Sequence, residues 1–139
     1  MIDEYLESKV TTATPFQLHL MVIDGAIRYA RAAETSLTQR NLTEAQSALA
    51  QARQFVAEML AGLDATQLPE VVDSLKALFV FVLRNLVRAD LQRDPILVAD
   101  SLRILHLHRE TWLAVAERLK QESTVEASVA VEGQFSWSS

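Results

Sequence analysis

The histidines are the residues of this chain best suited to metal or proton chemistry. There are three of them, His19, His106 and His108. His106 and His108 are two positions apart, so on a helix they point to different sides. The sequence also has no Glu-x-x-His pair, the spacing that builds di-iron sites in helical bundles. We therefore expect no metal site.

Other patterns that carry catalysis or bind cofactors are also missing from the sequence. It has no cysteine, which excludes thiol catalysis, disulfides and cysteine zinc sites. Its three glycines, Gly25, Gly62 and Gly133, are far apart and form no phosphate-binding loop. No Ser/His/acid arrangement is suggested by position. We expect no catalytic residue, no cofactor and no enzyme activity, and we look for a binding function instead.

Composition indicates a helical protein. Half of the 139 residues are hydrophobic, with only three glycines and three prolines, and this length suits one domain with its own core. The net charge of −5 argues against nucleic-acid binding. The longest apolar run is far short of the ~20 residues of a membrane span, and the acidic N-terminus lacks the apolar region of a signal peptide. We expect a cytoplasmic protein with no membrane insertion.

Four helices are predicted from start and stop signals. Residues 14–17, Thr-Pro-Phe-Gln, form a capping box, and Thr43 to Gln46 form a second candidate. Pro69 belongs in the first turn of the third helix, and Asp94-Pro95 starts the fourth almost without a loop. Short connections predict an all-α, antiparallel up-down four-helix bundle. The bundle domain would span residues 1–122, including an irregular N-terminal segment, residues 1–13.

The tail, residues 123–139, has a different period. Its apolar residues fall on odd positions: Val125, Ala127, Val129, Val131, Phe135 and Trp137. Such alternation is typical of a half-buried strand, but a lone strand cannot pair within a helical bundle. We expect a non-helical tail. Three alternatives stay open, namely disorder with chance alternation, docking on the bundle, and pairing with another molecule.

Helical spacing also predicts parts of the core. Gly25 lies inside the first helix, where it would let a neighbouring segment approach closely. Phe79 falls on the inner stripe of the third helix. The core side of the fourth helix is expected to be Val98, Leu102, Leu105, Trp112, Ala116 and Leu119.

The third helix, around residues 71–91, has more apolar surface than one face can bury. Its centre, residues 77–83, is entirely apolar, and its second face carries Asp73, Lys76, Ala77, Val80, Phe81, Arg84 and Arg88. Phe81, with arginines as helical neighbours, is expected to be partly exposed. The alternative is that the N-terminal segment or the tail covers it permanently. Arg84 and Arg88 either meet acidic groups of a partner or are solvated.

Several short motifs follow one another in a recognisable order. The opening contains Tyr5-Leu6, Val10 to Leu18, and Ile23 to Ile27. The likeness is to the family of the flagellar secretion chaperone FliS. It continues through Leu78 to Val82, Leu86 to Asp94 and Arg109 to Trp112, covering most of residues 5–119. The chain departs from the family pattern at Phe79 and Phe81 (usually tyrosine), Val80 (usually aspartate) and Asp90 (usually asparagine).

The resemblance implies a cytoplasmic export chaperone. Such a bundle would bind the C-terminal segment of flagellin, prevent its premature polymerisation and deliver it to the flagellar type III export apparatus, with the export gate as a further partner. The client-binding groove is expected at Phe81, Val80, Ala77, Arg84, Arg88, Val56 and Leu60. The N-terminal segment, through Tyr5, Leu6 and Val10, would cover this groove in the free protein, which we expect to be a monomer or a weak homodimer.

A second interpretation belongs to a different class. The chain would be a structural helical module that forms a homodimer through its apolar outer face and its tail.

Overall fold

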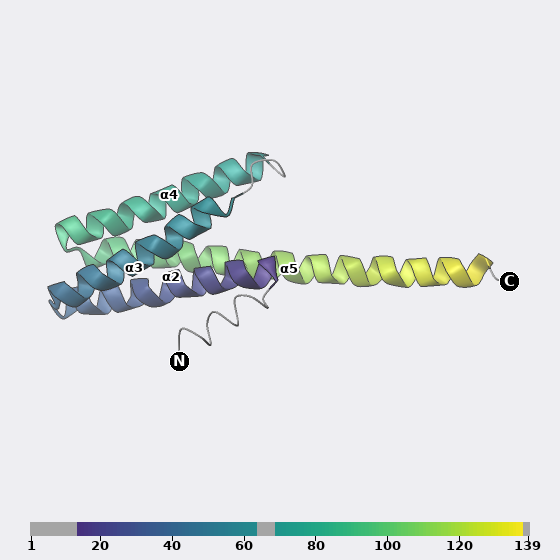
Figure 1. The fold of residues 1–139 in the computed structure, drawn as a ribbon, viewed down its shortest axis with the longest axis horizontal. Coiled ribbons are helices and arrows are strands. Elements are labelled where there is room, and N and C mark those ends of the chain that lie inside the picture. Colours follow the sequence, from purple (N-terminus) through teal and green to yellow (C-terminus); the bar gives the residue numbers. More distant parts are fainter. Residues whose placement is uncertain (1–13, 64–68, 138–139) are drawn as a thin grey trace. The chain divides into compact units, whose positions relative to one another are not determined.

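The computed structural model describes residues 14–63 and 69–137, with side chains as far as residue 129 (Figure 1). These residues form four helices, α2 (Pro15–Thr38), α3 (Leu42–Ala61), α4 (Pro69–Gln92) and α5 (Pro95–Trp137). The all-α four-helix architecture is therefore confirmed. The chain divides into two compact units, residues 1–109 and 110–139. The expected cap residues Tyr5, Leu6 and Val10 lie outside the described residues.

Two of the predicted helix starts are confirmed in detail. The Thr14 hydroxyl accepts a hydrogen bond from the Gln17 backbone N–H at 3.1 Å, and the Gln17 side chain accepts one from the Thr14 backbone N–H at 3.0 Å. This is the reciprocal pattern of a capping box, followed by Pro15 at the first helical position. Asp94 likewise caps α5, because its Oδ1 accepts from the Ile96 backbone N–H at 2.9 Å.

The second capping box was a wrong prediction. α3 begins one residue before Thr43, at Leu42, and its N-cap Asn41 makes no side-chain capping bond. The reason lies in the preceding turn. Arg40 adopts the left-handed conformation (φ 62°), and the Asn41 N–H donates to the carbonyl oxygen of Ser36 at 2.8 Å. This tight turn ends α2, and α3 begins directly after it.

The expectation of a non-helical tail is also wrong, because α5 continues through residues 123–137. Four of the six alternating apolar residues are valine or alanine, which a helix also accepts. The segment has no proline, and adding residues to an existing helix avoids the cost of nucleation. A strand would need a partner strand, and there is none among the residues that the structure describes.

The first unit packs α2, α3, α4 and the first part of α5 around one core. α2 and α5 are antiparallel, since His19 near the start of α2 contacts His108, whereas Thr38 at its end lies beside Pro95. The fully buried large side chains come from all four helices: Phe79, Ile23, Leu49, Met59, Leu86, Leu105, Val56, Val82, Val98 and Ser101.

Helix α5 follows the predicted core pattern only in its first half. Val98, Leu102 and Leu105 are buried, as expected. In the second unit, residues 110–139, Trp112 is half-buried but Leu119 is 59% exposed, so Leu119 was wrongly assigned to the core. The described part of this unit is a single helix, which offers no second element against which an apolar stripe can be buried.

Candidate protein-binding face

Helix α4 presents one face to solvent and the opposite face to the core. Phe79 is 1% exposed, whereas Phe81, two residues later, is 51% exposed. Ala77, Arg84 and Arg88 are exposed beside Phe81. The predicted division between an inner Phe79 and an outer Phe81 is therefore confirmed for the residues that the structure describes.

The expected groove needs correction where it includes α3. Val56 is fully buried on the same stripe as Ala52 and Met59, so it belongs to the core and is not a surface contact. Spacings of three and four residues place these side chains on one face of α3, turned toward the bundle. Leu60 is half-buried, as is Val80 on α4.

The exposed face extends further along α4 than the sequence indicated. Leu91, ten residues after Phe81, is 79% exposed, and Val87 is 41% exposed. No role was predicted for Leu91. Its position three residues after Arg88 was the one available signal that it shares the outer face. We call Phe81, Arg84, Arg88 and Leu91 the outer face of α4.

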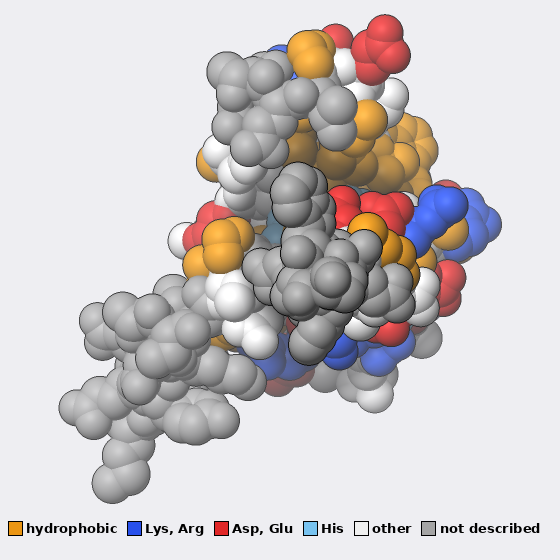
Figure 2. Space-filling view, turned by 90° about the vertical axis from the view of Figure 1, so that its right-hand side faces the viewer, with side chains coloured by type: hydrophobic (Ala, Val, Ile, Leu, Met, Phe, Trp, Pro, Cys, Tyr) orange, Lys and Arg blue, Asp and Glu red, His pale blue; other side chains and the backbone are white. Residues whose placement is uncertain are grey.

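The two arginines of the outer face have no acidic neighbour within α4. The residues three and four positions from Arg84 and Arg88 are apolar, amide or arginine side chains. The ion pairs within the described residues are formed by other arginines, and Arg53 of α3 takes the nearby carboxylate, Asp90, at 3.3 Å. In Figure 2, hydrophobic side chains gather in the upper part of the molecule, which is where α4 lies in Figure 1. Lys and Arg side chains lie next to them.

A part-buried pair of histidines joins α2 to α5 behind this face. The Nε2 atoms of His19 and His108 lie 2.9 Å apart, and the rings of His108 and Phe79 form a T-shaped contact with centroids 4.9 Å apart. Burial, and to a lesser extent the charge of His19, lowers the pKa of His108 to about 4. Burial also lowers the pKa of His19. Both imidazoles are therefore neutral near pH 7, and one donates a hydrogen bond to the other.

The contact between His19 and His108 was not predicted, because nothing in the sequence indicates that two histidines 89 positions apart meet. His106 instead accepts a hydrogen bond from Arg31 at 2.9 Å, and Arg109 pairs with Asp24 at 2.6 Å. The contacts of His108 with His19, of His106 with Arg31 and of Arg109 with Asp24 all join α5 to α2. Within the described residues, no group of three or more His, Cys, Asp or Glu side chains is placed to hold a metal ion.

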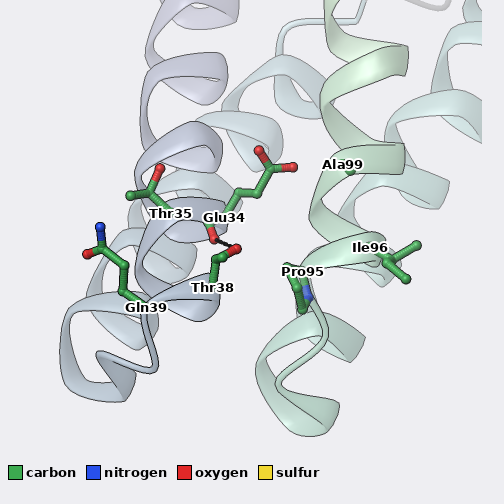
Figure 3. Close-up of a pocket in the computed structure, with 7 residues that line it drawn as sticks. All are labelled: Glu34, Thr35, Thr38, Gln39, Pro95, Ile96 and Ala99. Carbon is green, nitrogen blue, oxygen red and sulfur yellow. Dashed lines mark hydrogen bonds between the residues drawn. The ribbon is translucent and has the colours of Figure 1, made fainter.

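An open hollow of about 360 Å³ lies between the end of α2 and the start of α5 (Figure 3). Its lining combines polar residues of α2 with apolar residues of α5: Glu34, Thr35, Thr38, Gln39, Pro95, Ile96 and Ala99. The Thr38 hydroxyl donates to the backbone oxygen of Glu34 at 2.9 Å, so its donor is already used within α2. Among the described residues that line the hollow, Glu34 is the one with an ionisable side chain.

Among the helices that the structure describes, none is both long and apolar enough to cross a bilayer. A helical bundle with an exposed, partly apolar helix face is typical of proteins that bind segments of other proteins. Residues 1–119 match the family model described as flagellar protein FliS, and the chain belongs to this family. By class it is a flagellar export chaperone.

Two relatives support the assignment. The flagellar secretion chaperone FliS of Salmonella typhimurium is 30% identical over 120 residues, covering 85% of this chain and 89% of the relative. The flagellar secretion chaperone FliS of Bacillus subtilis is 25% identical over 108 residues, covering 78% of this chain and 80% of the relative.

Proposed function

We propose that this protein is a cytoplasmic chaperone that binds the C-terminal segment of flagellin, prevents its premature polymerisation and assists its delivery to the flagellar type III export apparatus. The observation that carries the proposal is Phe81, which is half exposed at the centre of α4 although Phe79, two residues away, is sealed in the core. An aromatic side chain held at the surface by a rigid helix is a ready anchor for a partner.

The mechanism is coupled folding and binding. A disordered client lays its apolar side chains along α4 and covers Phe81, Val80 and Ala77. Burying the exposed half of a phenylalanine contributes roughly 1 to 2 kcal/mol. Ordering the client costs about 2 to 5 kcal/mol, so binding requires a large contact area as well as one anchor. The covered client surface is then unable to drive filament assembly.

Residues 1–13 supply a competitor for this face in the proposed cycle. Tyr5, Leu6 and Val10 would occupy it in the free protein and be displaced by the client. The support is the resemblance of this segment to the family opening, together with its apolar residues. Deleting residues 1–12 should raise client affinity or cause aggregation. The competition model fails if the deletion changes neither property.

Coexpression with a flagellin C-terminal segment tests the proposed function directly. The wild-type chain should co-elute with the segment, and Phe81→Asp should abolish co-elution while its melting temperature stays close to that of the wild type. Ile96→Asp is a matched control, because it also places a carboxylate at an exposed apolar position, but on α5. The proposal fails if the folded wild-type chain does not retain the segment.

A homodimer remains the second candidate function. It is favoured by two exposed valines of α5, Val125 and Val129, which lie four residues apart and so on one side of the helix. Mass in solution with and without the flagellin segment separates the two candidates. A constant dimer that ignores the segment supports the homodimer, and a change to a heterocomplex supports the chaperone.

A further inference from the structure

We propose that the outer face of α4 selects a client helix that carries acidic side chains between two apolar anchors. This inference rests on the proposed function and specifies the chemistry of the client. The outer face consists of Phe81, Arg84, Arg88 and Leu91, and all four side chains are exposed.

The apolar members of this face stand at its two ends. Phe81 is 51% exposed and Leu91 is 79% exposed. They are ten residues apart, which corresponds to about 15 Å along a helix. Two apolar side chains of a helical client, also about ten residues apart, match this separation.

The cationic members stand between the anchors. Arg84 follows Phe81 by three positions, and Arg88 precedes Leu91 by three, so the two guanidinium groups lie within the span. Like charges four residues apart on a helix repel each other. The helix itself supplies no carboxylate at three or four positions from either arginine. Carboxylates from a client would relieve this repulsion and form charge-assisted hydrogen bonds.

The acidic residues of α4 are either paired with another helix or far along α4 from Arg84 and Arg88. Asp90 pairs with Arg53 of α3 at 3.3 Å. Glu70 and Asp73 lie at least three helical turns before Arg84, which is about 16 Å or more along the axis. The chain as a whole has a net charge of −5, so it repels a general polyanion. Attraction to acidic groups is therefore local to this face and requires the matching apolar anchors.

A second copy of the chain is a poor occupant for the same face. In a two-fold symmetric dimer the same patch faces itself. Four arginines would then meet across the interface, with no acidic residue among the members of the outer face. The charges favour a partner of opposite sign over self-association through α4.

Two synthetic peptides test the inference against the full-length protein. Both are 20-residue helical peptides with leucines ten residues apart on one face, and they differ only in having glutamate or glutamine at the positions between the leucines. We expect the glutamate peptide to bind at least about tenfold more tightly, because each carboxylate gains a charge-assisted contact. Added salt should reduce this preference. Equal affinity for the two peptides overturns the inference.

Variants locate the preference on the protein. Arg84→Gln with Arg88→Gln should reduce the preference for the glutamate peptide to less than about twofold, since it removes the charge from the face. Arg118→Gln with Lys120→Gln, which removes the same charge from exposed positions of α5, should retain it. A preference that persists without Arg84 and Arg88 contradicts the inference.

The same variants separate this inference from the proposed function. If a flagellin C-terminal segment binds the wild type and the Arg84/Arg88 variant equally, and Phe81→Asp abolishes binding, the chaperone function stands and the acidic preference is wrong. If the glutamate peptide shows its arginine-dependent preference but no flagellin segment binds, the inference stands and the proposed function is wrong.

Discussion

Gly25 of α2 is in direct contact with the aromatic ring of Phe55 of α3. A Cβ atom added at Gly25 would lie 2.6 Å from Cε1 of Phe55, closer than real Cβ atoms approach a neighbour. The Phe55 ring is also stacked on Tyr29, with centroids 5.7 Å apart. The close approach predicted at Gly25 is thus confirmed. The neighbouring side chain is the ring of Phe55, which Tyr29 also contacts.

Gly25→Ala is therefore expected to destabilise the fold. Alanine gains about 1 kcal/mol in helix propensity over glycine, but forcing the ring aside costs about 1 to 3 kcal/mol. Chemical unfolding should show a net loss of about 1 kcal/mol. Combined with Phe55→Leu, which removes the obstructing ring, the same substitution should become neutral or stabilising. A Gly25→Ala variant that keeps Phe55 and is as stable as the wild type would contradict the tight contact between Gly25 and Phe55.

Phe79 and Phe81 provide a matched pair of substitutions. Phe79→Ala should lower the free energy of unfolding by about 3 to 5 kcal/mol, because it leaves a cavity in the core. Phe81→Ala should change it by less than about 1 kcal/mol, since the ring is half exposed. Urea denaturation of both variants measures the difference. Similar losses for the two would show that Phe81 is a core residue.

Acid should destabilise the bundle through the His19–His108 pair. The pKa of His108 is lowered from 6.5 to about 4 in the folded protein, so between these values the unfolded chain binds more protons than the folded chain. Stability then falls as the pH is lowered from about 6.5 to about 4. The full effect at His108 is on the order of 3 kcal/mol. The lowered pKa of His19 acts in the same direction.

Denaturation curves at several pH values check this dependence. His108→Gln removes the titrating group while retaining an amide that can bond to His19. The stability of this variant should fall less steeply than that of the wild type as the pH is lowered from 6.5. His106→Gln, which alters the histidine that contacts Arg31, serves as the control. Equal slopes for the wild type and His108→Gln would argue against the contact between His19 and His108.

The two threonines at helix starts should respond differently to alanine. Thr14→Ala removes the observed capping bond to Gln17 and should cost about 1 kcal/mol. Thr43→Ala, although Thr43 was an expected N-cap, replaces an exposed residue inside α3 and should be neutral or slightly stabilising. Thermal unfolding compares the two variants. A larger loss of stability for Thr43→Ala than for Thr14→Ala would indicate that Thr43 is the N-cap of α3, as the sequence pattern predicted.

Local signals predicted most of the helices and failed at identifiable points. The capping box at Thr14 was predictable because its two hydrogen bonds join residues only three positions apart. The start of α3 was missed by two residues, since the N-cap is Asn41 and not Thr43. The left-handed Arg40 fixes this start, and an arginine gives no sequence cue for that conformation. The helical tail was missed because period-two alternation was given more weight than continuation of an existing helix.

The sequence by itself determined the presence and order of four helices, the close approach at Gly25 and the division of α4 between Phe79 and Phe81. Spacing within one helix settles which side chains share a face. Tertiary structure decided which of those faces are covered. It buried Val56, left Leu91 exposed and brought His19 to His108 across 89 positions of sequence. Such contacts depend on how whole helices pack, and a pattern confined to a few neighbouring residues carries no information about the helix that will lie opposite.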